Sequence, residues 1–189
     1  MPGFGISLRR YVDIAMSFVK CDIPANSVLD RRLIEAAFFR DSYRVPLCRV
    51  QATVVDIFFG IFGHHPVRMK IILIVRNRVA SYCELDAPSA FEILHPMRKS
   101  CYSTGDKIGP WPIFTLTPTE LVAGHNDRHL DFRLSVLKVV INGASASAVI
   151  STVCTTHNIF GKLYLFFVVP FHTWGVRKLL SSAVAADRL

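Results

Sequence analysis

The stretch that decides the fold is HLDFRLSVLKVVINGASASAVISTVCTT (His129–Thr156). In its first half, apolar residues alternate with polar ones, which is the pattern of a half-buried β-strand. Asn142-Gly143 follows, and this dipeptide favours a tight type I′ hairpin turn because that turn needs positive φ at both central positions. We therefore expect an antiparallel hairpin of two long strands, over residues 129–141 and 145–156.

The chain after this hairpin predicts one long helix. Asn158 is a good N-cap, and apolar residues recur from Phe160 to about Val184. Pro170 lies inside this segment and is expected to kink it. Because the first turns are apolar, we expect the helix to be buried against the sheet.

Before the hairpin, the sequence predicts shorter elements. A strand over 42–48 contains Pro46, which favours an edge position because proline has no N–H to donate to a ladder. Two helices are predicted next, over 52–62 and 67–82. The other predicted elements are strands at 113–116 and 120–123 and helical pieces near 8–19 and 28–38.

Composition indicates one domain with a large core. The chain has 189 residues, of which 51% are hydrophobic. We expect a leader, 1–23, which is predicted to be helical, and a single domain over 24–189.

The longest apolar run, 163–171, is shorter than the roughly 20 residues that a membrane span needs. The N-terminal region lacks the apolar run of a signal peptide. We therefore expect a cytoplasmic protein without a membrane span.

The charge does not indicate a nucleic-acid partner. The net charge is +8, but the basic residues are scattered and never form a run of four or more. A nucleic-acid-binding domain usually gathers its Lys and Arg residues on one face. We therefore expect no nucleic acid among the partners.

The predicted elements follow a recognisable order: a strand, two helices, an antiparallel meander and one long buried helix. This order resembles the START-like proteins, whose α+β helix-grip fold wraps a twisted antiparallel sheet around a C-terminal helix. Four segments narrow the resemblance to the bacterial family named domain of unknown function 2867: Gly124–Val136, Gly105–Gly109, Thr155–Asn158 with Gly161, and Pro170–His172. The resemblance covers Pro24 to Leu180. It implies a relationship to polyketide-cyclase and lipid-transfer proteins, which enclose apolar molecules between sheet and helix.

The first candidate site lies on the strand that begins near His129. Alternation places His129, Asp131 and Arg133 on the face opposite Leu130 and its apolar neighbours. One interpretation is an ordinary solvated strand face. The other places His129 and Asp131 at a cavity mouth as acid and base, with Arg133 orienting a polar head group. His129 and Asp131 do not complete a metal-ligand set, so we expect no metal.

The second candidate site lies on the long helix. Tyr164 and His172 are eight residues apart and share one face. Either both are core residues, or they contact a ligand in the cavity that the resemblance implies. The residues expected to line the same region are His157, Phe167, Phe171 and Trp174.

These features support several functions. The first is binding of a small hydrophobic molecule, lipid-like or polycyclic. The alternative is a cofactor-free cyclase, isomerase or dehydratase that uses His129, Asp131 and His172 for proton transfer. A third interpretation is a homodimer whose interface uses the apolar excess. The sequence has no nucleophile elbow, phosphate loop or dinucleotide fingerprint, so we expect no cofactor.

Overall fold

The computed structural model describes residues 18–64, 98–141 and 145–189. Within these ranges the chain forms one seven-stranded antiparallel sheet in the order β1-β2-β7-β6-β5-β4-β3. The strands are β1 (Val19–Lys20), β2 (Phe39–Leu47), β3 (Lys107–Ile108), β4 (Trp111–Leu116), β5 (Glu120–Asn126), β6 (Leu130–Val140) and β7 (Ala146–Thr156). The helices are α2 (Arg31–Glu35), α3 (Val54–Phe62) and α6 (Ile159–Ala185). The predicted α+β class, an antiparallel sheet with a long C-terminal helix, is confirmed.

The hairpin of β6 and β7 forms the centre of the sheet. The two strands have 11 residues each and pair from Leu130 opposite Thr156 to Val140 opposite Ala146. The backbone N–H of Ile141 donates to the carbonyl of Ser145 at 2.9 Å. The pairing of the two longest strands is therefore as predicted. The turn at Asn142-Gly143 lies outside the described residues.

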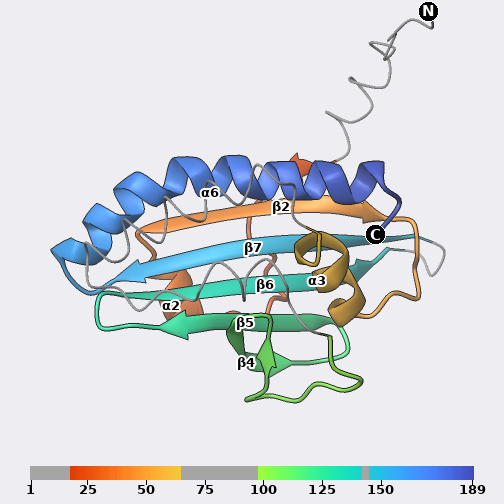
Figure 1. The fold of residues 1–189 in the computed structure, drawn as a ribbon, viewed down its shortest axis with the longest axis horizontal. Helices are drawn as coiled ribbons and strands as arrows, with labels where there is room; N and C mark the ends of the chain where they lie inside the picture. Colours follow the sequence, from red (N-terminus) through yellow and green to blue (C-terminus); the bar gives the residue numbers. More distant parts are fainter. Residues whose placement is uncertain (1–17, 65–97, 142–144) are drawn as a thin grey trace, which may run out of the picture.

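The sheet has two covered faces. On the first face, α3 and α6 pack on side chains of β2, β5, β6 and β7 in the main hydrophobic core. On the second face, Leu29 packs with Val122 and Val153, and residues of the segment before β2 surround this smaller cluster. Figure 1 shows α6 running alongside β2 and α3 crossing in front of the sheet.

The short helices begin at side chains that cap them. In α3, the Thr53 hydroxyl accepts from the backbone N–H of Asp56, and the Asp56 carboxylate accepts from the backbone N–H of Thr53. This capping box satisfies donors that the first helical turn leaves free. Helix α2 is shorter than the predicted 28–38 and begins after Asp30, whose carboxylate accepts from the backbone N–H of Arg32.

Some predicted elements differ or cannot be compared. Val19, predicted near the end of a helix, lies in β1 and pairs with Arg44 of β2. Strand β2 begins at Phe39, earlier than predicted. Its Pro46 pairs with Ser147 of β7 and lies beyond the two residues of β2 that β1 pairs with in the described part of the chain. The predicted helix over 67–82 lies outside the described residues.

Helix α6 agrees with the sequence in its ends but not in its burial. The side chain of Asn158 caps it by accepting from the backbone N–H groups of Phe160 and Gly161. One face is buried on the sheet: Gly161, Tyr164, Leu165, Gly175, Val176, Leu179, Leu180 and Ala183. The opposite face is exposed and also apolar. The helix lies against the sheet as expected, but only one of its faces is buried, because a single sheet covers only one side of a helix.

Candidate functional site

A polar cluster lies where β2 meets α6. In β2, residues alternate between the two faces of the sheet, and Tyr43 and Val45 belong to the main core under α6. Asp41 is two residues before Tyr43, so its side chain lies on the same face of the sheet and points toward α6. Its neighbour across the ladder is Thr152 of β7. An aspartate thus stands in a row of apolar side chains, where a carboxylate is costly unless it has a partner.

His172 of α6 lies over this aspartate. Its Nε2 is 3.6 Å from Oδ1 of Asp41, and the side chains are 23% and 4% exposed respectively. This separation exceeds an ordinary hydrogen bond. The ring of Phe39 packs edge-on against the imidazole, with 5.6 Å between the ring centroids.

Several polar atoms of this cluster are buried without a hydrogen-bond partner in the described part of the chain. They are both carboxylate oxygens of Asp41, Nε2 of His172 and Oγ1 of Thr152. Buried polar atoms in folded proteins nearly always have a partner, from the protein, from water or from a bound molecule. The buried polar atoms of Asp41, His172 and Thr152 are therefore candidate contacts for a water molecule or for a small polar group of a ligand.

Two further side chains set the electrostatics of the cluster. Burial raises the pKa of Tyr43, the negative charge of Asp41 raises that pKa further, and Arg177 opposes both effects. The Tyr43 hydroxyl lies near Asp41 and contributes to the rise, but it does not reach full hydrogen-bond geometry with either carboxylate oxygen. Tyr43 therefore stays protonated, and its hydroxyl is a donor beside the carboxylate.

His129 lies apart from this cluster, at the start of α6. It is buried, and its Nδ1 lies 3.1 Å from Oδ1 and 2.9 Å from Nδ2 of the Asn158 side chain. Nε of Arg128 donates to Nε2 of the ring at 2.8 Å, so both ring nitrogens are engaged. The carbonyl of His129 also accepts from the backbone N–H of His157 at 2.8 Å. These bonds hold the β6–β7 end of the sheet to the N-cap of α6.

Asp131, Arg133 and His157 belong to the second face and the rim of the sheet. Oδ1 of Asp131 is 3.3 Å from Nε2 of His157, and both side chains are partly exposed. Arg133 is buried, and its guanidinium lies 3.7 Å from the centre of the Phe114 ring. Burial lowers the pKa of Arg133, and the negative charge of Asp131 opposes this shift. The structure separates these residues from His172, because odd and even positions of β6 point to opposite faces.

The predicted residues of α6 also divide between two faces. Tyr164 is buried in a cluster with Leu130, Cys154 and Leu165. Phe167, Phe171 and Trp174 are about half exposed, so they point away from the sheet and do not line a space under the helix. Among the predicted residues on α6, His172 approaches the charged side chain of Asp41 in β2.

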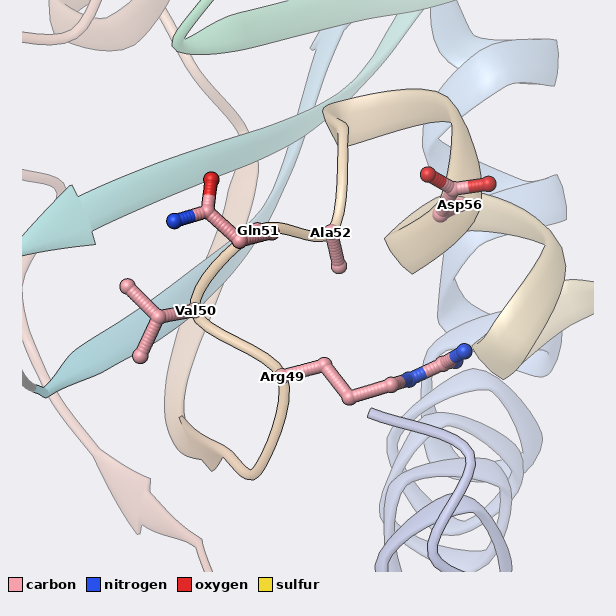
Figure 2. A pocket seen from close by; sticks show the side chains of 5 residues that line it. All are labelled: Arg49, Val50, Gln51, Ala52 and Asp56. Carbon is pink, nitrogen blue, oxygen red and sulfur yellow. The ribbon is translucent and has the colours of Figure 1, made fainter.

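A separate pocket lies in the loop between β2 and α3. Figure 2 shows its lining residues, Arg49, Val50, Gln51, Ala52 and Asp56. Its volume is about 450 Å³. The charged groups in it already have partners, since Arg49 donates to the carbonyl of Arg188 at 2.9 Å and Asp56 pairs with Arg98. This pocket lacks unpaired buried groups, so we do not place the function there.

The described residues contain no group of three or more His, Cys, Asp or Glu side chains suited to a metal ion.

The fold and this cluster define the class: an α+β protein whose antiparallel sheet carries a long C-terminal helix, with a buried aspartate of the sheet next to a partly buried histidine of the helix. The family model described as protein of unknown function (DUF2867) matches residues 33–179, and the chain belongs to this family. No curated protein and no solved structure gives a significant match.

Sequence reasoning missed Asp41. The signal was present, because Phe39, Asp41, Tyr43 and Val45 alternate with polar or charged residues. The predicted strand began at Ser42, so the aspartate was left outside the alternating pattern. Starting the strand three residues earlier places a carboxylate on its apolar side.

Proposed function

We propose that the protein binds a small, largely apolar molecule between the sheet and α6, with one polar group of the molecule held by Asp41 and His172. The observation that carries this proposal is the buried carboxylate of Asp41, which has no hydrogen-bond partner in the described part of the chain. A ligand hydroxyl that donates to it would supply the missing partner.

The chemistry of the cluster favours a donor group on the ligand. Asp41 is an acceptor when ionised, and a neutral His172 with its proton on Nδ1 accepts at Nε2. A phenol or alcohol therefore fits better than a carboxylate, which would meet the negative charge of Asp41. The surrounding apolar side chains, among them Phe39 and Tyr43, suit a lipid-like or polycyclic body of the polyketide or terpenoid type.

A cofactor-free isomerase, cyclase or dehydratase is the second candidate. Such an enzyme needs two titratable groups within reach of one substrate, and the 3.6 Å between Asp41 and His172 favours this function. In this function the pair would take a proton from one substrate atom and return it to another. His129 and Asp131, which the sequence grouped with His172, would have no part in that transfer.

The test compares 2-naphthol with its methyl ether, which has the same rings but no donor. We expect 2-naphthol to raise the melting temperature of the wild-type protein more than the ether does. Asp41→Asn replaces a charge-assisted hydrogen bond with a neutral one and should reduce this difference. His172→Ala should reduce the response while leaving the fold intact, as shown by an unchanged circular dichroism spectrum.

Glu120→Gln is the matched control, because Glu120 is also a buried carboxylate but lies on the second face of the sheet. It should leave the preference for 2-naphthol unchanged. Equal responses to both probes in the wild type and in Asp41→Asn would contradict the proposal. A large loss of stability in His172→Ala with an undiminished response to 2-naphthol would show that His172 is structural.

A further inference from the structure

The outer face of α6 is an apolar surface. Two of its residues, Ile159 and Phe166, are 69% and 72% exposed. Successive residues of a helix are about 100° apart, so the exposed apolar side chains share one side over the first four turns. We call this set the α6 outer face: Ile159, Phe160, Leu163, Phe166, Phe167, Phe171 and Trp174.

This surface is unusual for a soluble protein. Single exposed apolar residues are common, but a contiguous apolar strip usually marks a site of association with a protein or a membrane. Four phenylalanines and a tryptophan on one helix face would each expose a large ring to water. We therefore expect a partner molecule or a membrane to cover these side chains and remove them from water.

The charges of α6 indicate what kind of surface binds to its outer face. Its only charged side chains are Lys162, Arg177 and Lys178, all exposed, and the helix contains no Asp or Glu. The chain as a whole has a net charge of +8. A second copy facing this surface with its own α6 would bring cations against cations. An anionic lipid surface offers negative head groups together with an apolar layer beneath them.

The other side of α6 decides how it can meet a bilayer. The helix is long and apolar enough to cross a membrane by length and composition alone. However, Tyr164, Val176 and Leu180 on its inner side are buried in the protein cores. Crossing a bilayer would strip the helix from the sheet. A helix that lies flat keeps this packing.

We propose that the α6 outer face binds the surface of an anionic phospholipid bilayer, with the helix parallel to the membrane plane. The aromatic side chains enter the boundary between head groups and acyl chains, and Lys162, Arg177 and Lys178 contact the phosphates. This inference does not rest on the proposed ligand site, which lies on the opposite side of α6.

The experiment measures binding of the full chain to vesicles of phosphatidylcholine with and without phosphatidylserine. Trp174 lies on the proposed surface, so its fluorescence should shift to the blue and be quenched by brominated lipid. Binding should be stronger with phosphatidylserine and should weaken with salt. Phe166→Ser should weaken partitioning about tenfold, the effect of keeping one phenyl ring out of the apolar layer.

Phe38→Ser is the matched control, since Phe38 is 52% exposed but precedes β2 and lies off α6. It should bind vesicles as the wild type does. Lys162→Glu should weaken binding to phosphatidylserine vesicles but leave binding to pure phosphatidylcholine nearly unchanged. Both α6 variants change exposed side chains, so their circular dichroism spectra should match the wild type.

Three results would overturn the inference. The first is equal vesicle binding by the wild type and Phe166→Ser, or none by the wild type. The second is a dimer in sedimentation that Phe166→Ser converts to monomers, because the surface would then be an interface between copies. The third is equal binding to vesicles with and without phosphatidylserine at low and at high salt, because the anionic head groups would then contribute nothing.

Discussion

Glu120 allows a quantitative test of how the segment before β2 is attached to the sheet. Its side chain is fully buried on the second face. One carboxylate oxygen accepts from the Ser27 hydroxyl at 2.6 Å and from the Ser135 hydroxyl, and the other accepts from the backbone N–H of Val28 at 2.7 Å. Glu120 thereby links residues that are more than 90 positions apart in the sequence.

Glu120→Ala should lower the free energy of unfolding by about 2–5 kcal/mol. Leaving the buried hydroxyl of Ser135 and the part-buried N–H of Val28 without their acceptor costs about 1–3 kcal/mol. The cavity left by the missing side chain adds roughly another 1–2 kcal/mol. For a domain of this size, each kcal/mol lowers the melting temperature by about 2–4 °C, so a fall of about 5–20 °C is expected.

Urea unfolding followed by circular dichroism measures this loss. Glu120→Gln is the control, because its amide oxygen can still accept from Val28 while its NH₂ group donates to the two serine hydroxyls. It should cost clearly less than Glu120→Ala. The reasoning is refuted if Glu120→Ala changes stability by less than about 1 kcal/mol, since the stranded donor alone should cost that much.

Three more predictions concern other parts of the molecule. Gly161→Ala should reduce the melting temperature, because an added Cβ would lie 2.2 Å from the carbonyl oxygen of His129; an unchanged melting curve would show that α6 can shift freely there. The hydrogen bond from the Thr53 hydroxyl, followed by smaller contributions that include Arg98, lowers the pKa of Asp56 from 3.8 to about 2. The stability that the ionised Asp56 carboxylate contributes is therefore complete above about pH 4 and is lost as the pH falls through about 2. Asp56→Asn should make the urea midpoint depend less on pH between these values. Purified protein should contain no stoichiometric metal; one zinc or iron per chain in elemental analysis would contradict this and require ligands that we have not identified.

The contrast between the two buried carboxylates separates a structural role from a functional one. Glu120 has three donors, so it stabilises the fold. Asp41 has no hydrogen bond of full geometry within the described residues, so the nearby Tyr43 and His172 compensate the burial of its carboxylate less completely. Asp41→Asn should therefore leave the stability unchanged or raise it, while Glu120→Ala lowers it.

The sequence by itself determined the features that depend on residues adjacent in the chain, namely the strand pattern and the start of the long helix. Alternation predicted the paired strands of β6 and β7, and Asn158 predicted the first turn of α6. The family resemblance likewise rested on short local segments and agrees with the matched range, residues 33–179. Strand periodicity and helix capping are local effects, so they can be read from a few adjacent side chains.

Only the tertiary structure decided which side chains meet. The sequence grouped His172 with His129 and Asp131, but the sheet places Asp41 opposite His172 and turns Asp131 to the other face. The first turns of α6 are apolar on two opposite sides, with Lys162 as their one charged side chain, so the pattern did not mark which apolar side would face the sheet. That choice, and with it the exposed aromatic surface, follows from long-range packing, which brings β2 and α6 together from distant parts of the chain.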